Sequence, residues 1–400
     1  MLGEGLESAT GVRSVAGCIV RGADENPAPR VVHLALASAA LQPVLMARPL
    51  PDILPISWPA GLDVPPARTE EALDRAAGLL ADGGLVAIPT ETVYGLAADA
   101  LDGDSVDRIF TAKGRPASNP LIVHVADVAM ARSLAASWPE AAERITAALW
   151  PGPVTVIVPC GRRVPAAVTA AGSTVAIRCP AHPLTRRLIE KLGRPLAAPS
   201  ANRSMQLSPT TAGHVLESLG SRVDLILDGG PCDRGIESTV VDCTTAPPTI
   251  LRPGPISRVE LEAVVGGPVA VAASEATVAG DASTPPARSP GRQPRHYAPR
   301  TPLEVSANAA TRVATLVQAG KRVGWLTTRG ADADVRALAA SRDLVVVPMP
   351  ADPAAYAAGL YATLHAVDRR SLDAIVVDAP PDTEDWQPVA DRLGRAATGT

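Results

Sequence analysis

The stretch Pro89-Thr90-Glu91-Thr92-Val93-Tyr94-Gly95-Leu96 places hydroxyls, a carboxylate and a phenol beside a glycine. It directly follows Leu85-Val86-Ala87-Ile88, an apolar run that is typical of a buried strand. Lys113-Gly114-Arg115-Pro116 comes shortly afterwards, and Asn119 and His124 follow it. Polar groups packed this densely beside apolar runs indicate a binding site rather than a surface loop.

Strands and helices are predicted to alternate on both sides of this stretch. A helix is expected to begin at a cap formed by Thr69 and to end at Gly83-Gly84. A second helix is expected to run from a cap at Asp104 to Lys113. Further apolar runs predict strands at residues 121–125, 154–158, 174–178, 196–198, 225–227, 238–241 and 249–252, and helical patterns cover 127–137, 139–149 and 210–219. This interleaving predicts one α/β domain over residues 67–265, and it leaves the strand order open.

Three further segments surround this domain. Residues 1–66 mix glycine, proline, alanine and charge without a sustained period, so we expect a poorly ordered extension, with a small docking element as the alternative. Residues 266–300 have the Ala, Ser, Thr, Pro and Arg composition of a linker. Residues 301–400 predict a smaller, three-layered α/β unit, with strands at 323–327, 344–347 and 374–377 and helices near 353–369 and 386–397.

Composition limits the classes of function. A chain of 400 residues is too long for one ordinary core. The formal net charge of −4 gives no global basic field for nucleic acid, and an aromatic content of 2% leaves few stacking platforms for bases. The five cysteines are scattered without a CxxC pair, which argues against a zinc site and favours a reducing cytosol. Because no apolar run reaches the ~18 residues of a membrane span, we expect a cytoplasmic protein without membrane contact.

The common nucleotide-binding loops do not occur in the sequence. It contains no GxxxxGK[ST] motif and no GxGxxG that opens a helix, and we expect no flavin or nicotinamide cofactor. A phosphate site would therefore depend on side chains, and four cations lie at the edges of apolar runs: Lys113, Arg115, Arg178 and Arg252. Guanidinium groups bind carboxylate and phosphate oxygens at two points. The alternative is that these are four unrelated surface charges.

His124 interrupts an apolar strand, where a lone histidine is more often a structural group than a catalyst. Ser200 and Ser238 suggest a hydrolase triad with it, but neither lies in a GxSxG elbow. Ala198-Pro199-Ser200-Ala201-Asn202 and Glu237-Ser238-Thr239 are more typical of turns that present hydroxyl and backbone donors. Such groups suit a small polar ligand.

Five motifs occur in order along the chain, namely Pro89 to Leu96, Lys113 to His124, Ala198 to Asn202, Glu237 to Asp242, and Leu251 to Gly254. Together they resemble the YrdC/Sua5 family, the L-threonylcarbamoyladenylate synthases, and the ordered set is far more specific than any one motif. The proline-rich segment with His296-Tyr297, followed by a small α/β unit, is similar to the long, two-domain Sua5 form. Nothing in residues 1–66 matches the family.

The resemblance implies a fold and a reaction. The fold would be a twisted mixed sheet with flanking helices, plus a smaller Rossmann-like C-terminal domain. In the reaction, L-threonine, bicarbonate and ATP give threonylcarbamoyl-AMP and pyrophosphate, with Mg²⁺ accompanying ATP. A separate transferase complex then completes N6-threonylcarbamoyladenosine in tRNA, so contact of this chain with tRNA would be indirect.

The resemblance also implies roles for individual residues. The threonine site would consist of Thr92, His124, Arg178 and Ser238, with Arg178 holding the carboxylate. The cations in catalytic positions would be Lys113 and Arg115. ATP would bind at Lys113, Arg115, Asn119, Thr174, Ala198, Ser200, Ser208, Arg252 and Tyr297. Tyr297 resembles a tyrosine that reaches back over the nucleotide, so we expect the linker to cross the mouth of the site and the C-terminal domain to anchor it.

Two other classes of function are weighed against this synthase. A non-enzymatic RNA-binding module would use the same cations for a phosphate backbone, and its binding would weaken steeply with salt. A carbamoyl-transfer domain of the hydrogenase-maturation type predicts the use of carbamoyl phosphate. That type also predicts zinc-finger or acylphosphatase segments, which this sequence lacks.

Overall fold

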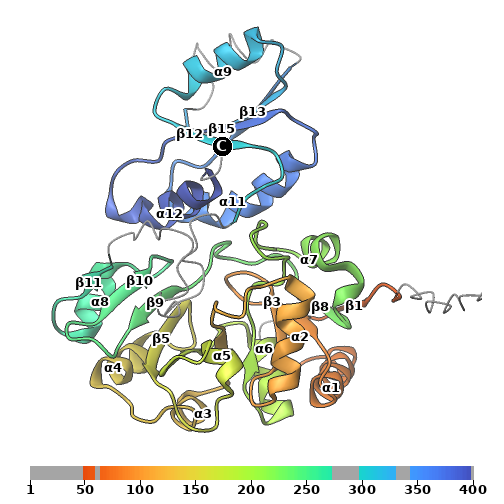
Figure 1. Cartoon of the computed structure of the whole chain (residues 1–400), viewed down its shortest axis with the longest axis vertical. Coiled ribbons are helices and arrows are strands. Elements are labelled where there is room, and N and C mark those ends of the chain that lie inside the picture. Colours follow the sequence, from red (N-terminus) through yellow and green to blue (C-terminus); the bar gives the residue numbers. More distant parts are fainter. Residues whose placement is uncertain (1–47, 59–63, 273–296, 330–342, 398–400) are drawn as a thin grey trace, which may run out of the picture. The chain divides into compact units, whose positions relative to one another are not determined.

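The computed structural model describes residues 48–58, 64–272, 297–329 and 343–397 (Figure 1). Strands and helices alternate through these ranges and form one large and one small sheet. The expected α/β fold, with a mixed sheet, flanking helices and a smaller C-terminal α/β unit, is confirmed. Among the helices of these ranges, none is both long and apolar enough to cross a membrane.

Within the described ranges the large sheet has 11 strands in the order β1-β8-β2-β3-β7-β4-β6-β5-β9-β10-β11. Their bounds are β1 (Asp52–Pro55), β2 (Val86–Ile88), β3 (Gly95–Asp99), β4 (Ile122–His124), β5 (Val154–Pro159), β6 (Thr174–Arg178), β7 (Leu196–Ala197), β8 (Leu225–Asp228), β9 (Thr239–Asp242), β10 (Thr249–Arg252) and β11 (Ala270–Val271). Parallel and antiparallel neighbours are mixed, since β4 and β6 run parallel whereas β5 and β6 run antiparallel.

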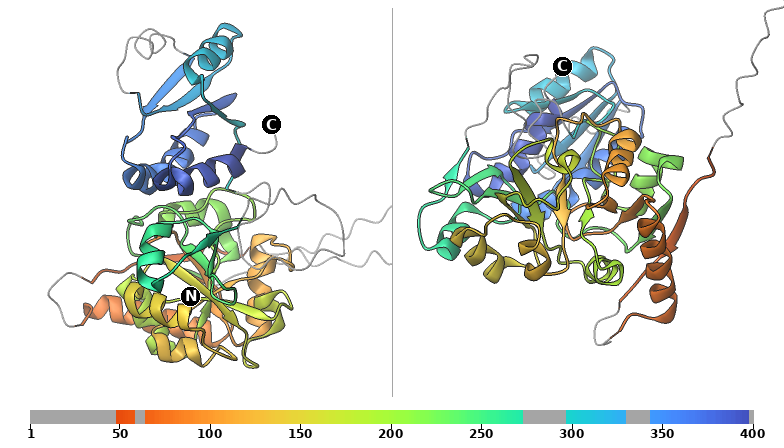
Figure 2. Two further views of the ribbon diagram at one scale, coloured as in Figure 1. Left: turned by 90° about the vertical axis from the view of Figure 1, so that its left-hand side faces the viewer. Right: turned by 60° about the horizontal axis from the view of Figure 1, so that its bottom comes forward.

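Alternate residues around β2 point into different cores, because successive side chains of a strand face opposite sides of the sheet. Val86 and Ile88 belong to one core, and Leu85 and Ala87 belong to the other. The first core includes side chains of α1 (Ala67–Ala81) and α6 (Pro183–Leu192), and the second includes side chains of α2 (Gly103–Lys113), α4 (Glu140–Leu149) and α7 (Ala212–Leu219). Figure 2 shows these helices beside the strands from two further sides. Short helical segments complete the unit: α3 (Val128–Arg132), α5 (Ala166–Thr169) and η1 (Gly220–Arg222).

Two helices begin at positions that differ from the prediction. α1 begins at Ala67 with Pro66 in the cap position, and the Thr69 hydroxyl donates to the Ser57 carbonyl at 3.1 Å instead of capping the helix. The cap of α2 is Asp102, whose carboxylate accepts a hydrogen bond from the backbone amide of Asp104 at 3.3 Å. Asp104 therefore lies in the first turn, where its charge still suits the helix N-terminus.

The expectation of a poorly ordered extension over residues 1–66 is wrong for its last part. β1 pairs in parallel with β8, with Asp52 opposite Leu225, and Ile56 is buried. β1 is an edge strand, where prolines are tolerated because one side of the strand makes no ladder hydrogen bonds. Residues 1–47 and 59–63 lie outside the described ranges.

The polar stretch that follows β2 is the loop of a hairpin. β3 runs antiparallel to β2, with Ile88 opposite Gly95, so residues 89–94 connect the two strands. β3 was not predicted, because its sequence Gly-Leu-Ala-Ala-Asp contains no β-branched or aromatic residue. Gly95 allows a close approach, since a Cβ at this position would lie 3.2 Å from the Cβ of Ala198.

The large sheet continues beyond the predicted domain boundary at residue 265. α8 (Arg258–Val265) begins with a capping box between Ser257 and Glu260. β11 then pairs in parallel with β10, so residues 270–271 belong to the sheet rather than to the predicted linker. Most of that linker, residues 273–296, lies outside the described ranges.

The C-terminal unit has a parallel sheet with the spatial order β12 (Leu303–Ser306), β15 (Ala374–Asp378), β13 (Val323–Thr327) and β14 (Leu344–Pro348). Trp325 packs in the core formed with α9 (Ala309–Gln318). Leu326 packs in the core formed with α11 (Pro353–Asp368), η2 (Glu384–Trp386) and α12 (Gln387–Ala397). Helices on both faces produce the predicted three layers, although β12 and α9 were not predicted.

Gly235 marks a very close approach of the chain to α11. Its φ is +68°, and a Cβ there would lie 2.2 Å from the carbonyl oxygen of Ala358. We expect Gly235→Ala to lower the free energy of unfolding by about 2 kcal/mol or more, because left-handed strain and overlap act together. Urea-induced unfolding measures this loss.

Gly193→Ala is the matched control for Gly235→Ala. Gly193 has a φ of +66°, but a Cβ there would meet no atom within 4 Å. This variant should lose only about 1 kcal/mol through backbone strain. Equal losses in the two variants would contradict the close contact with α11.

Candidate functional site

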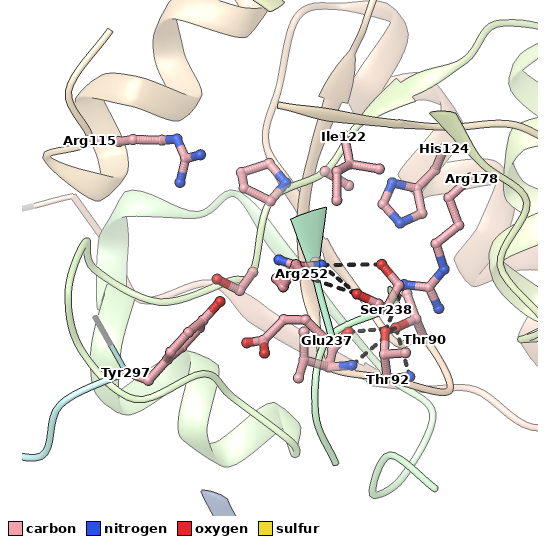
Figure 3. Close-up of a pocket in the computed structure, with 15 residues that line it drawn as sticks. Thr90, Thr92, Arg115, Ile122, His124, Arg178, Glu237, Ser238, Arg252 and Tyr297 are labelled. Carbon is pink, nitrogen blue, oxygen red and sulfur yellow. Dashed lines mark hydrogen bonds between the residues drawn. The ribbon is translucent and has the colours of Figure 1, made fainter. Parts of the chain in front are cut away.

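A cavity with a volume of about 50 Å³ opens beside the β2–β3 loop and the ends of β4, β6 and β10. It is lined by Thr90, Thr92, Val93, Gly95, Arg115, Ile122, His124, Arg178, Ala198, Pro199, Ser200, Glu237, Ser238, Arg252 and Tyr297. Figure 3 shows Thr92, His124 and Arg178 on one side, which we call the Arg178 end. Arg115 and Tyr297 lie on the other side, which we call the Tyr297 end, and Arg252 lies between the two.

The register of two strands brings the Arg178 end together. β4 and β6 are parallel neighbours, and His124 lies directly opposite Arg178 at their carboxyl ends. Ser238 immediately precedes β9, which pairs with β5, and its hydroxyl lies 2.8 Å from the Thr155 hydroxyl. The sheet therefore places side chains that are more than a hundred residues apart in sequence around one space.

Arg178 is held by a buried network. Its Nη2 lies 2.6 Å from Oε1 of Glu91, its Nη1 donates to the Thr92 hydroxyl at 2.8 Å, and its Nε donates to the Gly152 carbonyl at 3.2 Å. Burial alone would raise the pKa of Glu91, but the Arg178 guanidinium lowers it below its usual range. Glu91 therefore stays ionised and orients the guanidinium.

The hydroxyls of the β2–β3 loop are ordered by one another. Thr90 donates to the Val93 carbonyl at 2.6 Å, and its oxygen lies 2.8 Å from the Thr92 hydroxyl. Thr90 was not predicted as a site residue, although it lies in the polar stretch. Tyr94 in the same loop is part of the scaffold, because its hydroxyl donates to the Gly230 carbonyl at 2.7 Å.

His124 is buried as a neutral imidazole. Burial and the positive charge of Arg178 lower the pKa of His124 to about 3. Its Nδ1 has no hydrogen-bond partner among the described residues. The side chain therefore offers a polar atom to the cavity without a charge.

The four cations identified in the sequence are buried together rather than spread over the surface. Their exposed fractions are 2% for Lys113, 8% for Arg115, 3% for Arg178 and 4% for Arg252, so the alternative of unrelated surface charges is wrong. Arg178 pairs with Glu91, whereas Lys113, Arg115 and Arg252 donate to backbone carbonyls. Several buried cations around one space suit an anionic ligand, because burying a cation is costly unless an anion lies near it.

Arg115 and Arg252 are oriented by backbone carbonyls. Arg115 donates from Nε to the Asn119 carbonyl at 3.1 Å and from Nη2 to the Pro120 carbonyl at 2.8 Å. Arg252 donates from Nε and Nη2 to the Ser238 carbonyl at 3.1 and 3.0 Å. Burial lowers the pKa of Arg115 to about 10, so this side chain remains charged at neutral pH.

Four of the predicted site residues do not line the cavity. Lys113 donates from Nζ to the Ser200 and Asn202 carbonyls and so supports the 198–202 loop. Burial and the nearby Arg115 lower the pKa of Lys113 well below its usual value. Thr174 lies at the start of β6, whereas Arg178 lies at its end.

The other two lie just behind the lining. Asn119 is buried, and its side-chain amide has no hydrogen-bond partner among the described residues. The Ser208 hydroxyl donates to Oε1 of Glu237 at 2.6 Å. Glu237 itself lines the cavity and was not predicted as a site residue, although it begins one of the five motifs.

The described residues include no group of three or more His, Cys, Asp or Glu side chains that could hold a metal ion. Glu237, the carboxylate in the described lining, already accepts hydrogen bonds from Ser208, Tyr361 and Arg392.

Comparison with known proteins places this chain in a family. A family model described as "Telomere recombination" and named for Sua5, YciO and YrdC matches residues 78–254. A second, described as "Threonylcarbamoyl-AMP synthase, C-terminal domain", matches residues 256–398.

Relatives with assigned names cover most of the chain. The threonylcarbamoyl-AMP synthase of Bacillus subtilis is 42% identical over 331 residues, which are 81% of this chain and 92% of the relative. The enzyme of the same name from Pyrococcus abyssi is 39% identical over 330 residues, which are 80% of this chain and 93% of the relative. The crystal structure of P. abyssi Sua5 complexed with L-threonine matches with a TM-score of 0.75 and 36% identity, and covers 86% of this chain and 97% of that chain. The chain therefore belongs to the Sua5/YrdC family of threonylcarbamoyl-AMP synthases.

Proposed function

We propose that this enzyme is a nucleotidyltransferase that converts L-threonine, bicarbonate and ATP into threonylcarbamoyl-AMP, pyrophosphate and water. The observation that carries the proposal is one cavity with two chemically different ends. The Arg178 end has a guanidinium, hydroxyls and a neutral imidazole, which suit a small hydroxy amino acid. The Tyr297 end has an arginine and an aromatic ring, which suit a nucleotide.

Arg178 has donors left for a substrate carboxylate. A guanidinium has five N–H donors, and three of them are engaged by Gly152, Thr92 and Glu91. We infer that the two N–H groups left over, one on Nη1 and one on Nη2, bind the threonine carboxylate. The Thr92 and Ser238 hydroxyls lie beside this position for the amine and hydroxyl of threonine.

His124 acts in this proposal as a neutral hydrogen-bonding group. A group with a pKa of about 3 is too weak a base to take a proton from an ammonium ion near neutral pH. We infer that His124 binds and orients the amino acid, and that the amine reaches carbon dioxide or bicarbonate in its free-base form.

The carbamate of threonine then attacks the α-phosphate of ATP, and pyrophosphate leaves. This step needs no covalent nucleophile, because positioning and neutralisation of phosphate charge account for most phosphoryl-transfer catalysis. Arg115 and Arg252 supply fixed positive charge, and Asn119 supplies an unpaired amide. Lys113 holds the loop that contains Ala198 and Ser200. Mg²⁺ would enter as part of the MgATP substrate.

The product is a reactive mixed anhydride, so a further enzyme must consume it. We propose that a separate cytoplasmic transferase complex passes the threonylcarbamoyl group to an adenosine of tRNA. The net charge of −4 supports indirect rather than direct contact of this chain with tRNA.

The reaction itself is directly testable. Purified protein with ATP, Mg²⁺, threonine and bicarbonate should release pyrophosphate and form threonylcarbamoyl-AMP, detected by mass spectrometry. Omission of threonine or bicarbonate should abolish both products. Turnover of carbamoyl phosphate, or salt-sensitive tRNA binding without pyrophosphate release, would instead support the alternative functions.

Arg178→Lys tests whether threonine binds at the Arg178 end. Lysine retains the charge but cannot make the forked contact, so the KM for threonine should rise about tenfold or more while the KM for ATP changes little. Steady-state kinetics with each substrate varied in turn measures both constants. Arg132→Lys is the control, because Arg132 lies on an exposed part of α3 and pairs with Glu143. Equal increases in both KM values would contradict the assignment.

The protonation state of His124 gives a second test of the Arg178 end. The imidazole nitrogen shifts of His124, assigned with His124→Gln, should remain those of a neutral ring from pH 8 down to pH 5, because its pKa is about 3. Since an unfolded histidine titrates near 6.5, the unfolded state binds more protons below that pH. The His124 contribution to stability therefore decreases as pH falls from about 6.5 towards 3. A midpoint near 6.5 in the folded protein would contradict this description.

A further inference from the structure

Arg392, on α12 of the C-terminal unit, is fully buried, with a side-chain exposure of 0%. Its guanidinium contacts three segments that lie far from Arg392 in the sequence. Nε donates to Oε2 of Glu237 at 2.8 Å, and Nη1 donates to the Pro253 carbonyl at 3.0 Å. The guanidinium carbon also lies 5.4 Å from the centroid of the Tyr297 ring.

These three segments form the part of the cavity wall around the Tyr297 end. Glu237 and Tyr297 line the cavity directly. Pro253 follows Arg252, whose guanidinium lines the cavity and donates to the Ser238 carbonyl. One side chain of the C-terminal unit therefore contacts three chain segments that form the cavity wall.

Glu237 is the acceptor at the centre of this arrangement. Its carboxylate accepts from Arg392, from the Ser208 hydroxyl at 2.6 Å and from the Tyr361 hydroxyl at 3.2 Å. Burial alone would raise the pKa of Glu237, but Arg392 and Arg252 lower it to about 2. Removing Arg392 would leave a buried carboxylate short of its main counter-charge, which is strongly unfavourable.

Tyr297 needs support to keep its position. Its φ of 60° lies in the left-handed region, which is rare and strained for a bulky residue. The ring packs against Arg392 and lies 5.8 Å from the ring of Tyr361, centroid to centroid. The amide of Ala298 donates to the Met205 carbonyl at 3.0 Å and anchors the chain directly after it.

We propose that Arg392 is a positioning residue for the Tyr297 end of the cavity, and that Tyr361 assists it. Arg392 holds Glu237, the Arg252–Pro253 segment and Tyr297 in the arrangement that binds ATP. The C-terminal unit thereby acts on nucleotide binding mainly through the buried side chain of Arg392. The inference rests on the proposed function only in taking the ligand of the Tyr297 end to be ATP.

The test separates nucleotide binding from turnover. In Arg392→Met, which keeps the length of the aliphatic chain but removes the fork, the Kd for α,β-methylene-ATP should rise about tenfold. The Kd for threonine, measured alone by calorimetry, should stay within about twofold. Arg312→Met is the matched control, because Arg312 is an exposed arginine of the same unit, on α9, and it should leave both constants unchanged.

Two milder variants keep the test independent of folding. Arg392→Lys restores the charge without the forked contacts and should recover part of the nucleotide affinity. Tyr361→Phe deletes only the hydroxyl that donates to Glu237 and should weaken nucleotide binding less than Arg392→Met does. If Arg392→Met does not fold, these two variants decide the matter, and wild-type nucleotide affinity in both would overturn the proposal.

A parallel loss of threonine affinity would also overturn it, because Arg392 would then support the fold in general. Failure of the proposed function would look different. In that case the wild-type protein would release no pyrophosphate, whereas the difference in nucleotide affinity between wild type and Arg392→Met would still be measured.

Discussion

The buried ion pair of Arg178 and Glu91 is the interaction on which the site depends. Removing a guanidinium and a carboxylate from water costs several kcal/mol for each ion, and only close pairing with further hydrogen bonds offsets this. Glu91 comes from the β2–β3 loop and Arg178 from the end of β6, so the pair attaches a polar loop to the sheet. The same positive charge helps to keep His124 neutral. The Arg178 guanidinium, which Glu91 orients, thus also helps to set the protonation state of His124.

The two ends of the cavity are supported in different ways. The Arg178 end depends on the strand register of β4 and β6 and on a short loop, all of which lie in one α/β unit. The Tyr297 end also receives Arg392 and Tyr361 from the C-terminal unit. The chain has few aromatic residues, and two of them, Tyr297 and Tyr361, are buried next to each other at this end.

The parts of the fold that could be predicted from sequence are those where local pattern and burial agree. β5 and β6 are rich in valine and isoleucine, and both were predicted within a residue or so. β3 is alanine-rich, and β1 is a proline-flanked edge strand, so neither shows a propensity signal, and only their pairing partners make them strands. Most of the candidate site residues were found through ordered motifs, whereas Arg392 was not, because its partner Glu237 lies 155 positions away. Contacts of that kind follow from tertiary packing and leave no trace in local sequence.

The site also forms only when β4 and β6 pair in their native parallel register. His124 and Arg178 are adjacent only in the native register, in which His124 lies opposite Arg178 and Ile122 lies opposite Ala176. A slip of one residue would set Ile177 beside His124 and turn one strand's polar side chain to the opposite face of the sheet. It would also separate the Arg178 guanidinium from its buried partners, which is strongly unfavourable. The geometry of the Arg178 end and the register of β4 with β6 are therefore inseparable in this molecule.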